Sequence, residues 1–91
     1  MDHLSVNEIY KRLEELNHWE MIDDGISKRF EFPDFKAAME FVNRVAVEAE
    51  NENHHPDIAI NYNKVILHLV THSVGGLTHK DFKLAKIIDN L

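Results

Sequence analysis

Three histidines in the second half of the chain have the chemistry to transfer protons within one site. His54 and His55 are adjacent and precede Pro56, and His72 follows an apolar run further along the chain. The pKa of a free imidazole lies close to neutral, so such side chains serve as both acids and bases at physiological pH. This cluster therefore suits acid–base catalysis, and it needs no metal or organic cofactor.

Two carboxylates lie at suggestive distances from these histidines. Glu50 comes four residues before His54, where it could accept a hydrogen bond from that imidazole and stabilise its protonated form. Asp81 comes three residues after Thr78, which is the spacing of a helix capping box, so we expect its role to be mainly structural. Tyr62 lies between the histidines, and we expect it to contribute to packing rather than to chemistry.

Two other interpretations of the histidines stay open at this point. They could be ordinary loop and strand-end residues, or they could bind a metal. Adjacent side chains tend to diverge, and no Cys or His-x-x-x-His helix supports His54 and His55 as ligands. His68 shares a predicted strand face with His72 but lies about 13 Å away, too far to bind the same ion. We therefore expect no metal site.

Length, charge and composition define the class of protein. The chain has 91 residues, a formal charge of −6 and no cysteine. A negative surface repels phosphate backbones, which argues against direct nucleic-acid binding. The residues at the start lack the basic and apolar regions of a signal peptide, and no apolar run approaches the roughly 20 residues that span a membrane. We expect a cytoplasmic protein with one domain over residues 1–91, without disulfides or membrane contact.

Turn signals and hydrophobic spacing predict seven elements. Ser5 and Glu8 form a capping box, Asp23-Asp24-Gly25 is typical of a hairpin, and Thr78 is a helix N-cap. The predicted elements are a helix from Ser5 to about Asn17, strands Trp19–Ile22 and Ile26–Phe32, a helix from Asp34, strands Asp57–Tyr62 and Lys64–His72, and a helix from Thr78. The order α-β-β-α-β-β-α predicts an α+β fold, with a four-stranded antiparallel sheet and three helices on one face.

The last predicted strand also indicates self-association. One of its faces would lie under the helices, and the other is too apolar to be fully solvated. The second face contains Ile66, His68, Val70 and His72. An open sheet also leaves two edges, which pairing with a second copy would protect. We therefore expect a homodimer or homotetramer, with part of this face covered by a partner or a ligand.

The spacing of residues over Glu50–Asp81 resembles the signature of the pterin-4a-carbinolamine dehydratases, also called 4a-hydroxytetrahydrobiopterin dehydratases. The resemblance covers nearly the whole chain. Its signature residues are Glu50, His54-His55-Pro56, Tyr62, His72 and Asp81. Further matches are Trp19, Phe30–Phe35, Asn61–Val65, Thr71 and Gly76-Leu77-Thr78.

The resemblance implies a hydro-lyase that removes water from a 4a-hydroxytetrahydropterin and so supports tetrahydrobiopterin recycling, without a cofactor. It implies that His54 is the main acid/base and that His55 holds the pterin and assists. His72 would be the second acid/base. The resemblance also implies that Pro56 and the backbone of Thr71, His72, Ser73 and Val74 line the polar edge of the pterin, and that Trp19 forms a wall of the pocket. Asn53 stands where some family members have an acid.

The resemblance leaves two alternatives open. Some animal members of the family stabilise the dimer of a homeodomain transcription factor, so this chain could be a dimerisation scaffold. A pure scaffold has no reason to retain His54, His55 and His72, whereas this chain has all three. The same pocket could also serve molybdopterin metabolism. A neighbouring aromatic amino acid hydroxylase gene would favour the recycling function, and neighbouring molybdopterin genes would favour the second alternative.

Overall fold

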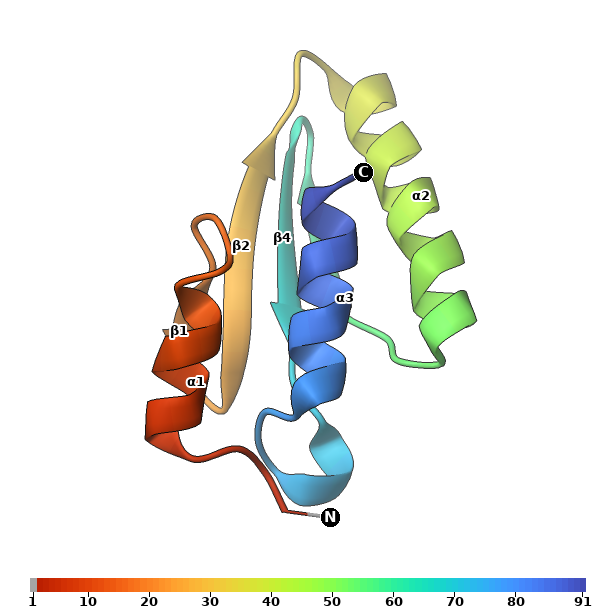
Figure 1. Cartoon of the computed structure of the whole chain (residues 1–91). Helices are drawn as coiled ribbons and strands as arrows, with labels where there is room; N and C mark the ends of the chain where they lie inside the picture. The colour runs from red at the N-terminus through yellow and green to blue at the C-terminus, as the bar shows by residue number, and fades with distance from the viewer. Residues whose placement is uncertain (1) are drawn as a thin grey trace.

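The computed structural model describes residues 2–91 and confirms the predicted order α-β-β-α-β-β-α. The elements are α1 (Val6–Leu13), β1 (Glu20–Ile22), β2 (Gly25–Glu31), α2 (Phe35–Glu52), β3 (Asp57–Asn61), β4 (Lys64–Leu69), a short 3-10 helix η1 (His72–Val74) and α3 (His79–Asp89). The strands form one antiparallel sheet in the order β1-β2-β4-β3. Figure 1 shows α1, α2 and α3 on the same face of this sheet, as predicted.

The hydrophobic core lies between the helices and the two central strands. Alternate residues of β4, which are Val65, Leu67 and Leu69, have no exposed surface. They are covered by buried side chains of α2 and α3, among them Val45 and Leu84. Each fully buried Val or Leu contributes about 1.5–3 kcal/mol to folding. The core therefore holds β4 and α3 in fixed positions, and these two elements lead to the site described below.

The carboxyl end of α3 is attached to the sheet by a polar cluster. Asp89 Oδ1 accepts hydrogen bonds from Trp19 Nε1 at 3.0 Å and from Lys28 Nζ at 2.8 Å. The indole of Trp19 is buried, with 6% of its surface exposed. A buried indole N–H needs an acceptor, and Asp89 supplies it. Trp19 thus fixes the far end of α3, away from the end that begins at His79.

The first predicted helix is shorter than expected. It ends at Leu13 instead of about Asn17, because the next hydrogen bonds, from Glu15 N to Arg12 O and from Leu16 N to Leu13 O, span three residues. Such bonds tighten the backbone into 3-10-type turns. His18 then has a φ of 63°, which reverses the chain toward β1.

The prediction that the last strand continues to His72 was wrong, because β4 ends at Leu69. Thr71 N donates to Gly76 O at 2.9 Å, and Gly76 N donates back to Thr71 O at 3.4 Å. This closed loop includes Gly75, whose φ of 63° is readily adopted by glycine. The loop folds the chain out of the strand, so His72 lies in η1 and not on a sheet face.

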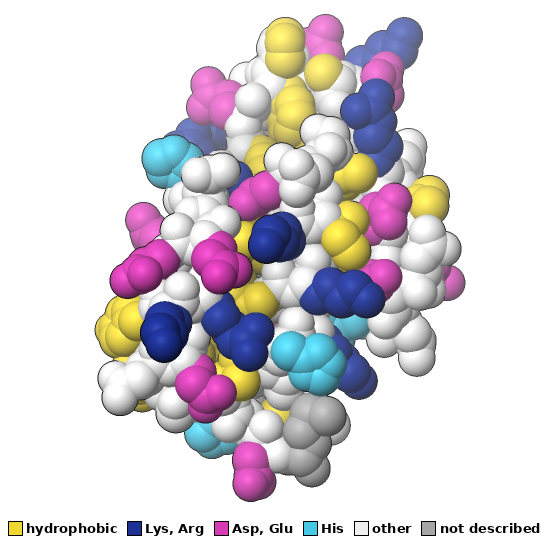
Figure 2. Space-filling view, in the orientation of Figure 1, with side chains coloured by type: hydrophobic (Ala, Val, Ile, Leu, Met, Phe, Trp, Pro, Cys, Tyr) yellow, Lys and Arg dark blue, Asp and Glu magenta, His cyan; other side chains and the backbone are white. Residues whose placement is uncertain are grey.

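Charged side chains of both signs are mixed on the helix-covered side of the molecule (Figure 2). Lys and Arg side chains lie among Asp and Glu, and this face has no continuous basic surface. Within residues 2–91, every helix is too short or too polar to cross a lipid bilayer.

Candidate active site

A pocket of about 290 Å³ lies where the end of α2, the segment after β4 and the start of α3 meet. We call it the histidine pocket. Its lining residues are Asn53, His54, His55, Val70, Thr71, His72, Ser73 and Lys80. The three predicted acid/base residues, His54, His55 and His72, therefore line one cavity, together with Thr71 and Ser73.

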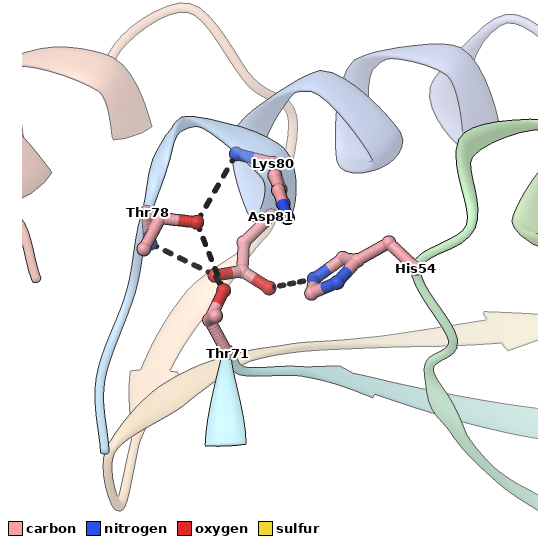
Figure 3. Close-up of polar contacts among 5 residues, drawn as sticks. All are labelled: His54, Thr71, Thr78, Lys80 and Asp81. Atoms are coloured by element: carbon pink, nitrogen blue, oxygen red, sulfur yellow. Dashed lines mark hydrogen bonds and ion pairs between the residues drawn. The ribbon is translucent and has the colours of Figure 1, made fainter. Parts of the chain in front are cut away.

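The end of α2 directs His54 into this pocket. Asn53 has left-handed backbone angles, with φ 49° and ψ 44°, and asparagine tolerates this conformation better than most residues. The next backbone N–H, that of His54, donates to Ala49 O at 3.1 Å. These contacts end the helix in a tight reversal, and the His54 side chain then points toward α3 (Figure 3).

His54 is held by a buried carboxylate. His54 Nε2 and Asp81 Oδ1 are 2.5 Å apart, and the two side chains are 11% and 0% exposed. The other oxygen, Asp81 Oδ2, accepts from Thr71 Oγ1 at 2.8 Å and from the backbone N of Thr78 at 2.9 Å. Figure 3 shows His54 and Thr71 approaching Asp81 from different segments of the chain. Asp81 is thus fixed by its contacts with Thr71 and Thr78, and it fixes the imidazole of His54 in turn.

The predicted structural role of Asp81 is confirmed, but it is incomplete. Asp81 and Thr78 form the capping box that begins α3. The Thr71 hydroxyl donates to Asp81, and the Thr78 and Thr71 hydroxyl oxygens lie 2.9 Å apart, so Thr78 can donate to Thr71. The same carboxylate therefore caps a helix and binds His54, and the spacing along the sequence did not predict this second contact.

Glu50 contacts a histidine, as expected, but that histidine is His55 and not His54. Glu50 Oε2 lies 2.5 Å from Nε2 of His55, and these side chains are 75% and 57% exposed. Spacing along a continuous helix would have placed Glu50 beside His54. The reversal at Asn53 instead turns His54 toward Asp81 and leaves His55 facing Glu50.

The prediction that His68 and His72 share a strand face was also wrong, because His68 lies in β4 and His72 in η1. Both side chains line a second cavity of about 190 Å³, which borders the histidine pocket at Val70 and His72. A separation counted along one strand does not apply to this pair, because β4 ends at Leu69. His68 Nδ1 lies 2.5 Å from Ser27 Oγ on the neighbouring strand. Three aspartates, Asp23, Asp24 and Asp57, complete this second cavity with Gly75.

Among residues 2–91, no group of three or more His, Cys, Asp or Glu side chains has a geometry that could hold a metal ion.

Other residues from the sequence analysis lie outside the lining of the histidine pocket. Trp19 is buried beside Asp89 at the opposite end of α3. Pro56 and Val74 are half-buried neighbours of lining residues. Tyr62 was expected to pack, but it is 62% exposed because it lies with φ 55° in the turn between β3 and β4.

Three lining residues were missed: Asn53, Val70 and Lys80. An asparagine after a long amphipathic helix is typical of a left-handed C-terminal cap, so the role of Asn53 in orienting His54 could have been predicted. Lys80 places a positive charge in the first turn of a helix, where the helix dipole disfavours it. The position of Val70 depends on where β4 ends and has no comparable signal.

A larger depression, of about 480 Å³, lies mainly on the open face of the sheet. Ile22 and Ile66 are 45% and 46% exposed there. Its remaining lining residues are His18, Glu20, Ser27, Lys28, Arg29 and Glu31. It contains a single histidine and none of the predicted acid/base residues, so the smaller histidine pocket is the candidate active site.

Known proteins match this chain over nearly its whole length. A family model described as "Pterin 4 alpha carbinolamine dehydratase" matches residues 2–91. A relative from Picosynechococcus sp. is 47% identical over 88 residues, which are 97% of this chain and 96% of that protein. A relative from Acidobacterium capsulatum is 50% identical over 91 residues, which are 100% and 99% of the two chains. Both are named for pterin-4-alpha-carbinolamine dehydratase as an inferred activity.

Two solved structures share the fold. The crystal structure of a "transcriptional coactivator/pterin dehydratase" from Brucella melitensis has a TM-score of 0.94 and 34% identity, and the match covers 98% of this chain and 97% of that one. A pterin dehydratase-like protein described as a RuBisCO assembly factor of the alpha-carboxysome has a TM-score of 0.65 at 19% identity, and the match covers 79% and 83% of the two chains. At that identity the second structure supports the fold alone.

Proposed function

Because the chain belongs to the pterin-4-alpha-carbinolamine dehydratase family, we propose that it removes water from a 4a-hydroxytetrahydropterin. In this reaction the C4a–O bond breaks and the leaving hydroxyl takes up a proton. N5 loses its proton, a double bond forms between N5 and C4a, and quinonoid dihydropterin and water are released. The observation that carries this proposal is that His54, His55 and His72, from two distant segments, line one pocket.

His54 is the main acid/base in this proposal. Its Nε2 donates to Asp81, so its Nδ1 is the atom left to exchange a proton with the substrate. When the ring is protonated, Nδ1–H can donate to the leaving hydroxyl, and when the ring is neutral, Nδ1 can accept a proton. A carboxylate that binds one ring nitrogen fixes which nitrogen is available for proton transfer. Asp81 therefore acts as a positioning residue for His54.

His72 is the second acid/base, and His55 holds the pterin. The two side chains are exposed within the pocket, and His55 is oriented by Glu50. The backbone of Thr71, Ser73 and Val74, with Pro56, lines the polar edge of the pterin. Trp19 keeps a structural role, since its indole is bound to Asp89. The product would return to the tetrahydrobiopterin cycle after aromatic amino acid hydroxylation.

The decay of chemically generated 4a-hydroxytetrahydropterin in the presence of the protein tests this proposal. We expect acceleration over the uncatalysed rate, and His54→Ala should remove about 10²- to 10⁴-fold of it, as is typical when a general acid or base is lost. His79→Ala is the matched control, because His79 is exposed on the first turn of α3 and does not line the pocket. An unaccelerated decay would exclude the dehydratase function, and equal losses in the two variants would exclude the assignment of His54.

A dimerisation scaffold is the second candidate, favoured by the name "transcriptional coactivator/pterin dehydratase" of the Brucella melitensis relative. In this case the three pocket histidines would be dispensable. Normal partner binding by His54→Ala, combined with decay of the carbinolamine at the uncatalysed rate, would support the scaffold over the enzyme.

A further inference from the structure

We propose that Lys80 is a substrate-positioning residue of the histidine pocket and that its ammonium group binds the 4-oxo oxygen of the pterin ring. This inference rests on the proposed function, because it names the substrate atom that the same pocket recognises. Three features of Lys80 carry it: its charge, its lack of a carboxylate partner and its place beside the residue that holds His54.

Lys80 gives the histidine pocket its permanent charge. Among the lining residues in the described part of the chain, it alone carries a charge that does not depend on the protonation of an imidazole. Its side chain is exposed, as expected for a flexible donor at the rim of a pocket. A lysine in this position offers N–H donors and no acceptor, so it selects an oxygen or another acceptor atom on the ligand.

The other lysines of α3 are paired, and Lys80 is not. Lys83 Nζ lies 3.0 Å from Glu52, and Lys86 Nζ lies 3.8 Å from Glu15. Within residues 2–91, Lys80 has no Asp or Glu oxygen within 4.0 Å. Its sequence neighbour Asp81 is already bound to His54, Thr71 and Thr78. The Lys80 ammonium therefore remains available to a ligand.

The position of Lys80 in the first turn of α3 is unfavourable for a cation. The positive end of the helix dipole lies there, and such a placement typically costs about 0.3–1 kcal/mol. The backbone is nevertheless fixed, because Lys80 N donates to Thr78 Oγ1 at 3.3 Å (Figure 3). A charge held against a local electrostatic preference beside a histidine cluster is typical of a functional residue.

The covalent structure of the substrate identifies the atom that Lys80 binds. In the proposed reaction His54 acts on the hydroxyl at C4a, and the 4-oxo group is attached to the neighbouring ring carbon. Lys80 directly precedes Asp81, the residue that binds His54. Lys80 and His54 also line the same pocket of about 290 Å³. With the C4a hydroxyl at His54, a donor elsewhere on the wall of so small a pocket can reach the substituent on the adjoining ring carbon. The 2-amino and N3–H groups are donors and cannot accept a hydrogen bond from an ammonium group. N1, the other acceptor of this ring, is two bonds from C4a, whereas the carbon of the 4-oxo group is bonded to C4a directly.

The first experiment compares KM and kcat for the 4a-hydroxytetrahydropterin among three variants. Lys80→Gln should raise KM about three- to tenfold with little change in kcat, since a partly exposed hydrogen bond to a charged group is lost. Lys80→Arg should restore most of the affinity. Lys83→Gln is the matched control one turn along α3, and it should behave like the wild type because Lys83 pairs with Glu52 outside the pocket.

The second experiment measures the binding of two unreactive ligands, a fully oxidised pterin and the 2,4-diaminopteridine in which an amino group replaces the 4-oxo oxygen. Lys80→Gln should weaken binding of the pterin about three- to tenfold and should not weaken binding of the diamino compound. Equal losses for both ligands would overturn the assignment, and so would a fall in kcat at unchanged KM. This binding experiment needs no turnover, so it tests Lys80 even if the wild type fails to dehydrate the carbinolamine. A failure of the dehydratase proposal can therefore be distinguished from a failure of the Lys80 proposal.

Discussion

Two carboxylate–imidazole pairs border the histidine pocket. They differ in burial, so the loss of one partner should cost a different free energy in each pair. The Asp81–His54 pair is buried, whereas both members of the Glu50–His55 pair are more than half exposed. Exposed ion pairs contribute about 0–1 kcal/mol, because water competes for both groups. Removing one partner of a buried pair leaves the other without a hydrogen bond, which costs about 1–3 kcal/mol or more.

Asp81→Asn should therefore affect both activity and stability. The asparagine keeps one oxygen, and an NH₂ group replaces the other oxygen of Asp81. Either His54 loses its acceptor, or Thr71 and Thr78 lose theirs. We expect turnover to fall about 10²-fold. The free energy of unfolding should fall by about 1–3 kcal/mol. Steady-state kinetics and urea denaturation measure the two effects.

Glu50→Gln is the matched control for this prediction. It changes a carboxylate to an amide in the same way, but at an exposed position. The free energy of unfolding should change by less than about 1 kcal/mol, and turnover should fall by less than in Asp81→Asn. A larger loss of turnover in Glu50→Gln would mean that His55, and not His54, is the main acid/base.

At the scale of elements, helix ends position the site. The left-handed residue at the end of α2 directs His54, and the capping box at the start of α3 places Asp81. The loop between Thr71 and Gly76 carries His72. Helix caps and a closed turn thus position His54, Asp81 and His72.

Asn53→Ala tests the cap of α2. Left-handed backbone angles destabilise alanine by about 1–2 kcal/mol, whereas glycine adopts them freely. We expect Asn53→Ala to lower the free energy of unfolding by about 1 kcal/mol and to reduce turnover by displacing His54. Asn53→Gly should retain most of both properties. If the two variants lose turnover equally, the amide side chain of Asn53 matters more than its backbone conformation.

The capping box of α1 predicts a pH effect on stability. Hydrogen bonds from the backbone and side chain of Ser5 lower the pKa of Glu8 from its usual value of 4.5. A carboxyl with a lowered pKa in the folded state stabilises the fold above its unfolded pKa, and this stabilisation is lost as pH falls through the lowered value. Glu8→Gln should therefore lower Tm near neutral pH and have no effect in strong acid. Thermal unfolding at both pH values measures this difference.

At the scale of the whole molecule, the sheet has two edge strands, and the longer is β3. All five residues of β3 are exposed, and Ile58 and Ile60 are 38% and 39% exposed. Such an edge invites pairing with another strand. We propose that a second copy of the chain covers this edge in a homodimer or homotetramer.

Sedimentation at micromolar concentration tests this self-association. We expect the wild type to sediment as a dimer or a tetramer, and Ile60→Lys to shift the distribution toward monomer, because a charge on an edge strand opposes pairing. Glu14→Lys also introduces a lysine at an exposed position, at the end of α1 and away from the sheet edge, and should leave the distribution unchanged. A monomeric wild type would contradict the proposal.

The sequence by itself determined the order of the elements and the identity of the three pocket histidines. Alternation in β4 and the cap signals at Ser5 and Thr78 are local patterns, and local backbone preferences are sufficient to produce them. The full-length match to one family also reflects the spacing from Glu50 to Asp81 that is visible in the sequence.

Only the tertiary structure decided which carboxylate binds which histidine. Glu50 is close to His54 in sequence, but one left-handed residue, Asn53, redirects the chain so that His54 forms a hydrogen bond with Asp81. The closed loop from Thr71 to Gly76 likewise removed His72 from the strand and brought it to the cavity of His68. Side-chain pairing depends on backbone direction at single residues, and spacing along the chain does not contain that direction. The place of Lys80 in the histidine pocket was likewise decided by tertiary contacts, which join the start of α3 to the end of α2 through Asp81 with His54 and Lys83 with Glu52.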